Sequence, residues 1–495
     1  MIDDRTPVIV GAGQHNERER GSEPIDLMAS CVEAALMDAR APALRGSISA
    51  VRVVWGVWPY ADPGRLVANR IGAPGARTTL TVMGGNQVYD LVNDTAARIR
   101  RGELDVAVIC AAETLRTRRH DRAAGRSTEY LPEPEGASPD ETFGEEKSMA
   151  TPVERGLGIE TAVNFYAMAE TAIRHRNGET VDAHRRRIAS LWAAGSSVAA
   201  DNPDAWIRTA VPADQIAVES DSNRPIASPY PKLMTANLNV DQGGAVVMCS
   251  ASAAARAGVP SDRWVFPWSG ASAADHWYPT NRWAFDESPA MRLAGRRALA
   301  LADLGVDDCA LIDLYSCFPA AVQVAQRELA IAPTRPWTIT GGLTFAAGPL
   351  NCYCILPLVR AVRLLRDTPA ERAFLTGNGG YFTKHSTLVL AGEPPANGFA
   401  YESVQQDVDG LPSRPTPVDP PRNATIETYT VIHDREGTPQ RAIVACLDRD
   451  GRRHWAETCA AEELTQLLSD DCCGHPADRY DVRYADGRGS SPAAR

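Results

Sequence analysis

The 495-residue chain has the composition of an ordinary globular protein, with 44% hydrophobic and 23% charged residues. Its formal net charge of −11 excludes a nucleic-acid binder, because no basic stripe could offset that charge. No apolar run reaches the length of about 20 residues that spans a bilayer. The first residues have no signal-peptide character, so we expect a cytoplasmic protein of several domains.

Cysteine usage also indicates a reducing compartment. The eleven cysteines are odd in number and include no CxxC pair, so we expect free thiols rather than a disulfide framework. Cys472, Cys473 and His475 lie close together near the C-terminus, but no second ligand pair accompanies them. We therefore predict no metal site, and we expect the two thiols to be exposed in a polar tail.

The first part of the chain reads as alternating strands and helices. A strand over 7–11 precedes a helix over 24–39, and a second strand follows at 51–55. A glycine-containing loop at 79–86 then leads into an apolar-striped helix that ends near Arg101, with Asn86 placed to cap its start. A buried strand over 105–111 completes this unit.

A second unit has the same order of elements. The small-residue loop at 341–349 leads into an apolar-striped stretch that ends at Arg366, and a strand over 372–380 follows. Loops of this kind place backbone N–H groups at a helix N-terminus, where an oxyanion or phosphate is stabilised. The repetition predicts a duplicated α/β architecture with its site between the two halves.

Two further segments differ in composition from this core. A polar, Pro/Gly-rich stretch and a helical stretch predict an inserted subdomain over 116–235. Prolines recur from Pro394 to Pro421, which predicts a stiff linker over 396–422. Alternating residues then predict a separate antiparallel β module over 423–470, and a disordered polar tail over 471–495.

Several motifs in this order resemble the thiolase superfamily, and most closely the sterol-carrier-protein-type thiolases and thiolase-like proteins with an added C-terminal domain. They are GELDVAVICAAE at 102–113, DQGGA at 241–245, DLYSCF at 313–318, GGL at 341–343 and GPL at 348–350. The resemblance implies a duplicated five-layered α/β fold with halves at 1–260 and 261–395. The β module resembles the OB-fold proteins that accompany some thiolases.

The same resemblance implies an acyltransferase that acts on acyl-CoA thioesters in lipid metabolism, yet the family's reactive residues are replaced. The nucleophilic cysteine falls at Gly85, and the histidine of the Gly-His-Pro motif is missing from Gly348-Pro349. Tyr315-Ser316 stands for the motif that helps to bind the thioester oxygen, and the second cysteine is absent from 377–379. Removing a nucleophile that acts together with its base lowers the rate by on the order of a millionfold, so we do not expect ordinary thiolysis.

The resemblance therefore implies a cleft that still binds an acyl-CoA ligand, and it implies no covalently bound cofactor. Tyr315 is the candidate neutral hydrogen-bond donor, and His385 is either a general base or a structural histidine. We expect the glycines to enlarge the pocket and admit a bulkier acyl group. The predicted substrate-binding residues are Gly85, Asn86, Tyr315, Gly348, Asn378, Gly379 and Gly380.

Other interpretations remain open. A cleft that is kept while its catalytic residues are replaced is also consistent with a non-catalytic CoA- or lipid-binding protein. The β module of such a protein would dock a partner protein. The sequence VIVGAG at 8–13 opens like a dinucleotide-binding loop, which would indicate an NAD(P)-dependent oxidoreductase. That pattern is weak, because Asn16 replaces the third glycine and no acidic residue ends the strand at 51–55. The sequence fits either a monomer or a homodimer.

Overall fold

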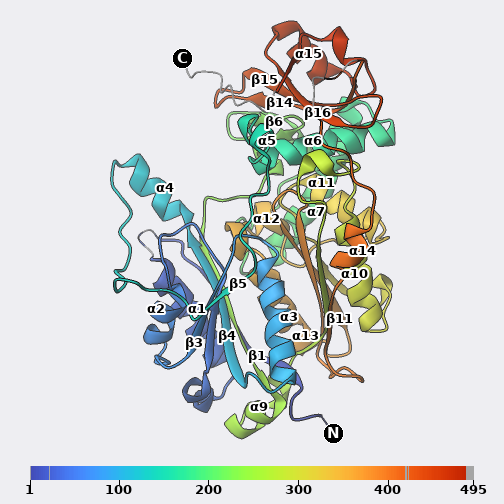
Figure 1. Ribbon diagram of the computed structural model, residues 1–495. Coiled ribbons are helices and arrows are strands. Elements are labelled where there is room, and N and C mark those ends of the chain that lie inside the picture. Colours follow the sequence, from blue (N-terminus) through green and yellow to red (C-terminus); the bar gives the residue numbers. More distant parts are fainter. Residues whose placement is uncertain (1, 20, 22, 418–420, 422, 486–495) are drawn as a thin grey trace.

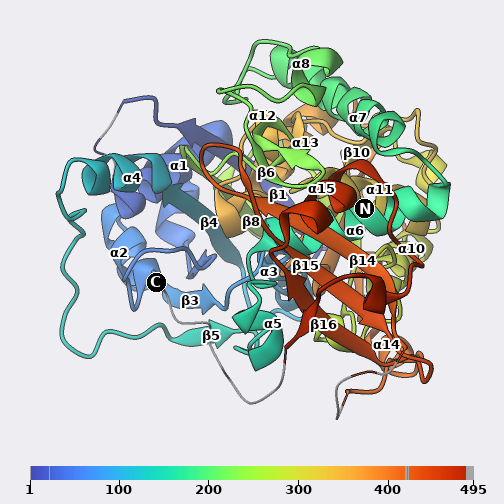
Figure 2. The same ribbon diagram turned by 90° about the horizontal axis from the view of Figure 1, so that it is seen from above.

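Two α/β halves stand side by side with a third sheet at one end (Figure 1). The computed structural model describes residues 2–19, 21, 23–417, 421 and 423–485. Figure 2 views the molecule from the end that carries the third sheet. That sheet lies over the second half rather than over α1 (Pro24–Asp38), α2 (Pro63–Arg70) and α4 (Leu115–Ala123) of the first half.

The first half is built on a six-stranded sheet with the order β1-β8-β4-β2-β3-β5. Strand β2 is parallel to β3 and β4, whereas β8 is antiparallel to both β1 and β4. The strands are β1 (Pro7–Asn16), β2 (Ala50–Val53), β3 (Arg77–Thr81), β4 (Val106–Thr114), β5 (Glu141–Phe143) and β8 (Asp241–Ser250).

Four strands of the second half repeat this order, with β10-β11-β12-β9 corresponding to β2-β4-β8-β1, and β13 adds a fifth strand beside β9. Strand β12 is antiparallel to β9 and β11, and β11 is parallel to β10, as β4 is to β2. The duplicated fold predicted from the two loops is therefore confirmed. The strands are β9 (Phe266–Ala274), β10 (Leu311–Asp313), β11 (Arg372–Gly379), β12 (Lys384–Ala391) and β13 (Ala400–Ser403).

Two helices fill the space between the sheets and complete a five-layered arrangement. Helices α3 (Gln87–Arg100) and α13 (Ile355–Asp367) each contact strands of both sheets, while α1 (Pro24–Asp38) and α10 (Pro289–Leu301) pack on the outer faces. Asn93 of α3 donates from Nδ2 to the carbonyl oxygen of Thr387 in β12 at 3.1 Å. The remaining core helices are α2 (Pro63–Arg70), α9 (Ala251–Ala257), α11 (Pro319–Glu328), α12 (Gly342–Phe345) and α14 (Gln405–Asp409).

The segment between β4 and β8 carries several helices, and it also adds strands to two sheets. Strand β5 extends the edge of the first sheet beside β3. Strands β6 (Pro225–Ala227) and β7 (Tyr230–Pro231) join the third sheet. The helices of this segment are α4 (Leu115–Ala123), α5 (Pro152–Gly156), α6 (Ala162–Asn177), α7 (Val181–Asp201) and α8 (Ala213–Ala217).

The C-terminal residues form an antiparallel sheet, as predicted, but that sheet is not a separate module. Its order is β17-β16-β15-β14-β6-β7, so the inserted segment supplies one edge. Thr428 of β14 donates from Oγ1 to the carbonyl oxygen of Met168 in α6 at 2.6 Å. The elements are β14 (Thr425–His433), β15 (Pro439–Leu447), β16 (Arg453–Thr458), β17 (Arg483–Tyr484) and α15 (Ala461–Ser469).

Two segments expected to lie outside the folded core, a stiff linker and a disordered tail, are partly folded. Strand β13 pairs with β9, so the second sheet continues past residue 395 into the expected linker. The expected polar tail packs as far as residue 485, because Cys472, Cys473 and Tyr480 bury apolar surface under the C-terminal sheet. The expectation of exposed thiols there was wrong. Residues 418–420, 422 and 486–495 lie outside the described part of the chain.

The dinucleotide-like sequence at 8–13 has a structural explanation. It lies inside β1 rather than in a loop. A Cβ added at Gly11 would collide with the backbone of Ala35, and one at Gly13 with the backbone of Cys31. These glycines therefore allow α1 to pack closely on β1, and the phosphate-binding loop of the oxidoreductase interpretation is not formed. Among the described residues, no helix combines the length and apolar character needed to cross a membrane.

Candidate functional site

The N-terminus of α3 is the centre of the candidate site. The loop after β3 brings Gly84, Gly85 and Asn86 to the start of this helix, between the two sheets. Asn86 does not cap the helix as expected, because its own backbone is helical and it makes no capping hydrogen bond. Instead its Nδ2 donates to Oδ2 of Asp90, one turn further along, at 2.6 Å.

Tyr315 occupies the space into which a side chain at position 85 would point. A Cβ built on Gly85 would lie 2.6 Å from the phenolic oxygen of Tyr315 and 2.5 Å from the carbonyl oxygen of Asn378. The backbone N–H of Tyr315 donates to Oγ1 of Thr376 at 3.0 Å, and its ring meets that of Tyr353 edge-on at 5.6 Å. Position 85 is therefore closed by the second half of the molecule.

The second glycine expected to widen the pocket is closed as well. A Cβ at Gly348 would lie 2.9 Å from Cδ2 and 3.0 Å from Cβ of Leu343. The backbone N–H of Gly348 donates to the carbonyl oxygen of Asn237 at 3.1 Å. The expectation that these glycines enlarge a pocket was wrong, because neighbouring side chains fill the space at both positions.

The end of β11 meets the α3 terminus from the opposite side. Asn378 donates from Nδ2 to the hydroxyl of Tyr166 at 2.8 Å, while its carbonyl oxygen faces Gly85. Gly379 lies against Oδ1 of Asn86 with no room for a Cβ, and Gly380 has a left-handed backbone with φ of 73°. The structure thus brings the predicted residues of β11 and α3 together.

Several buried polar atoms at this junction have no hydrogen-bond partner within the described chain. They are Oδ1 of Asn86, the hydroxyl of Tyr89 and Oδ1 of Asn378. A buried polar group without a partner costs about 1–3 kcal/mol, so such groups are uncommon in stable folds. Their concentration beside one helix terminus marks this junction as the place where a polar ligand group would find partners.

His385 faces away from this junction. It is buried on β12, and its Nε2 lies 3.0 Å from both Ser288 Oγ and the carbonyl oxygen of Phe382. The same Nε2 lies 3.7 Å from Oδ2 of Asp275. These partners belong to the loop at 382 and to the outer layer around α10, so the geometry favours the structural role that the sequence left open.

The neighbouring residue Lys384 does lie at the junction. Its ammonium group donates to the carbonyl oxygen of Met83, whose side chain is exposed. Burial lowers the pKa of Lys384, although nearby Asp90 opposes this effect. Burial also raises the pKa of Asp90 to about 6. Sequence reasoning missed Met83 and Asp90, although the spacing of Asp90 from Asn86, one helical turn, was a usable signal.

A second cationic side chain, that of Lys147, belongs to a segment that also contacts the end of β11. The ammonium group of Lys147 is 4.7 Å from the centre of the Trp277 ring, within cation–π range. The indole of Trp277 donates to the carbonyl oxygen of Ser148 at 2.6 Å, and Met149 lies directly against Gly380. We call Met83, Lys147, Met149, Trp277 and Lys384 the rim. It combines apolar surface with two positive charges, and the carboxylates of Asp90 and Glu146 lie close enough to Lys384 to oppose the lowering of its pKa.

No thiol at this junction has the properties of a nucleophile. Cys354 donates from Sγ to the carbonyl oxygen of Gly85 at 2.9 Å, and burial raises its pKa well above the usual range. Burial likewise raises the pKa of Cys317 to about 12, and it raises that of Cys352 well above the usual range. Because the thiolate is the reactive form, these cysteines are inert at neutral pH.

The fold and the C-terminal residues both match known proteins. Residues 403–482 match the family described as "Thiolase-like protein type 1 additional C-terminal domain". The structure is similar to that of a monomeric SCP2-thiolase like protein type 1 from Mycobacterium smegmatis, with a TM-score of 0.82 and 31% identity over 96% of each chain.

A more distant likeness shows the fold alone. A structure titled "Ltp2-ChsH2(DUF35) aldolase" matches with a TM-score of 0.60 and 19% identity, over 78% of this chain and 98% of that chain. No curated protein matches the chain.

Proposed function

The chain belongs to the SCP2-thiolase-like proteins of type 1 in the thiolase superfamily, and on that premise we propose that it binds an acyl-CoA thioester or related acyl ligand without carrying out ordinary thiolysis. The observation that carries this proposal is the phenol of Tyr315, which takes the space of a side chain at position 85. Where a nucleophile would project, the protein presents a hydrogen-bond donor.

Tyr315 is suited to binding rather than to covalent chemistry. Burial raises its pKa well above the usual range, so the phenol stays neutral and keeps its proton at physiological pH. A neutral phenol can donate to a thioester carbonyl, and one such bond contributes about 1 kcal/mol. The inert thiols of Cys317, Cys352 and Cys354 offer no replacement nucleophile nearby.

The rim supports a ligand that is apolar at one end and anionic at the other. Since Gly85 and Gly348 are closed, the ligand approaches from the side of Met83 and Lys384. The ammonium groups of Lys147 and Lys384 can pair with phosphate oxygens of coenzyme A, and the side chains of Met83 and Trp277 offer apolar contact. We assign such a protein to lipid metabolism in the cytoplasm, with the thioester as a diffusible ligand.

Calorimetric titration with coenzyme A, a short-chain acyl-CoA and a long-chain acyl-CoA tests the proposal. Lys384→Gln should weaken binding about tenfold or more, because a charge-assisted hydrogen bond is worth about 1.5–3 kcal/mol. Lys232→Gln is the matched control, since Lys232 is exposed on another part of the surface. Absence of heat with every ligand at millimolar concentration, or equal affinities for the two lysine variants, would refute the proposal.

A further inference from the structure

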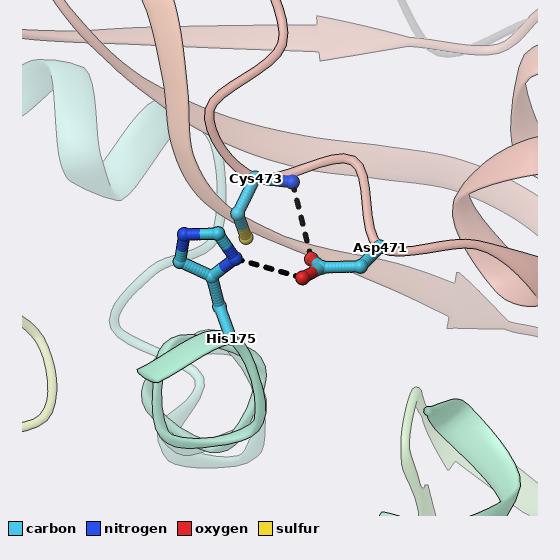
Figure 3. Close-up of side chains that lie close together, drawn as sticks. All are labelled: His175, Asp471 and Cys473. Carbon is cyan, nitrogen blue, oxygen red and sulfur yellow. Dashed lines mark hydrogen bonds and ion pairs between the residues drawn. The ribbon is translucent and has the colours of Figure 1, made fainter. Parts of the chain in front are cut away.

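A cluster of potential metal ligands joins the C-terminal domain to the inserted segment. His175 at the end of α6 lies beside Asp471 and Cys473, which follow α15 in the chain (Figure 3). One ligand atom from each of the three side chains lies within 4.8 Å of the other two. We propose that these residues bind a transition-metal ion, with Zn²⁺ as the best match.

The ligand set identifies the class of ion. Imidazole nitrogen, thiolate sulfur and carboxylate oxygen are the three donor types that Zn²⁺ takes in proteins, usually with tetrahedral geometry. Three protein ligands leave a fourth position for water. A hard ion such as Mg²⁺ or Ca²⁺ would instead require mainly oxygen ligands, which this cluster does not supply.

The surroundings position Asp471 for this role. Its Oδ1 accepts from the backbone N–H of Cys473 at 3.2 Å and from Nη2 of Arg174 at 3.3 Å. Its Oδ2 is hydrogen-bonded to Nδ1 of His175 at 2.7 Å, and an ion bound by both atoms would replace this hydrogen bond. Groups that hold the non-ligating oxygen of a carboxylate in this way orient it toward a metal.

Charge and access are also compatible with a divalent cation. Burial raises the pKa of the Cys473 thiol, so the ion itself would deprotonate it on binding. The resulting thiolate and the Asp471 carboxylate would together neutralise the two positive charges of the ion. Arg174 lies close by, but its guanidinium is held by the hydroxyl of Tyr429 at 2.7 Å as well as by Asp471. The side chains of His175 and Asp471 are 49% and 34% exposed, so an ion can reach the cluster from solvent.

Nearby residues of the same types have other partners. The Sγ of Cys472 lies 3.9 Å from the carbonyl oxygen of Gln466, and Nδ1 of His475 lies 3.0 Å from the hydroxyl of Tyr480. The side chains that lie beside Cys473 are therefore those of Asp471 and the distant His175, and not those of Cys472 and His475. Cys472 and His475 instead offer matched controls for Cys473 and His175.

An ion in this cluster would connect segments about 300 residues apart in sequence. It would bind the folded arrangement of α6 and the C-terminal domain far better than the unfolded chain. Because an ion bound by the native state alone stabilises that state, the thermal midpoint should rise with the concentration of free Zn²⁺. We therefore expect Zn²⁺ to stabilise the junction between the inserted segment and the C-terminal domain.

The test uses full-length, tag-free protein stripped with a chelator. We expect calorimetry to show one Zn²⁺ bound per chain, and Co²⁺ to give the near-ultraviolet absorption of a thiolate–cobalt bond. Cys473→Ser should abolish that band, and both Cys473→Ser and His175→Ala should weaken Zn²⁺ binding by on the order of tenfold or more.

The controls separate this site from incidental binding. Cys472→Ser and His475→Ala should leave the affinity for Zn²⁺ and the Co²⁺ spectrum unchanged. The thermal midpoint should rise with Zn²⁺ in wild type and in these two controls, but not in Cys473→Ser. Two results would overturn the proposal: no Zn²⁺ binding by the wild type beyond that of Cys473→Ser, or a Co²⁺ complex without a thiolate band.

Discussion

The closed position at Gly85 makes a sharp prediction about stability. Gly85→Ala adds a single methyl group, and that methyl carbon would lie within 3 Å of Tyr315 and of the carbonyl oxygen of Asn378. Tyr315 can shift, but the carbonyl belongs to the backbone of β11 and cannot rotate away. We therefore expect the substitution to destabilise the protein by about 1–3 kcal/mol, the usual range for overpacking a core.

The matched control is Gly46→Ala, which adds the same methyl group where no atom lies within 4 Å. The backbone of Gly46 is not in the left-handed region, so an alanine fits without strain. Such a substitution stabilises a protein by about 0.4–1 kcal/mol, because it restricts the unfolded chain. The free energies of unfolding of the two variants should thus differ by roughly 1.4–4 kcal/mol.

Urea titration followed by tryptophan fluorescence measures this difference. A second variant, Tyr315→Leu, should recover part of the loss when combined with Gly85→Ala, since it removes the phenolic oxygen from the contact. Neighbouring residues of this kind typically show a coupling of about 0.5–3 kcal/mol. If Gly85→Ala unfolds at the same urea concentration as Gly46→Ala, Tyr315 does not fill this space and the proposed role of its phenol fails with it.

Further predictions follow from buried groups and from the C-terminal sheet. Burial raises the pKa of Glu113 to about 8 from 4.5, so its ionisation destabilises the fold as the pH rises through this range. Glu113→Gln keeps an acceptor for the backbone N–H of Val57 and should unfold at higher urea than wild type at pH 9, but at nearly the same urea at pH 5; equal midpoints at both pH values would contradict this. Of the eleven thiols, that of Cys459 is exposed and should alone react rapidly with a thiol reagent in the native protein, so Cys459→Ser should remove the fast phase. A chain ending at residue 417 should lose stability or aggregate, because it uncovers the faces of α6 and β6 that pack on β14; an unchanged thermal midpoint would argue against that interface.

The elements of the core could be predicted because their signals are local. The apolar stripe of α3 and the uninterrupted apolar run of β4 are properties of neighbouring residues, and both elements form close to the expected positions. The repeated order of loop, helix and strand was enough to predict the duplication. It could not show that β6 joins β14, because that pairing unites segments about 200 residues apart and rests on a single pair of residues.

The candidate site was harder to predict than the fold. Asn86 was expected to cap α3, but its side chain bonds to Asp90, and a residue type cannot reveal which of two nearby partners it will choose. The burial of Cys472 and Cys473 depends on the sheet above them, and His175 reaches Asp471 from the inserted segment. Each of these placements follows from the packing of distant segments, so it leaves no periodic pattern in the sequence.

The glycines around α3 leave no cavity where larger side chains could stand. Position 85 is filled by Tyr315, Gly379 makes room for Oδ1 of Asn86, and Gly380 lies against Met149. In each case the filling side chain comes from a different segment than the glycine, so the glycine and its filler are complementary across an interface. Protein interiors pack at the density of organic crystals, and an empty site costs free energy in proportion to its volume. A chain that had only lost its reactive side chains would retain voids there, whereas here the same space is occupied and the two halves are held together. The junction is therefore a built contact, and a ligand must gain its affinity at the rim and the phenol of Tyr315 rather than in a vacated pocket.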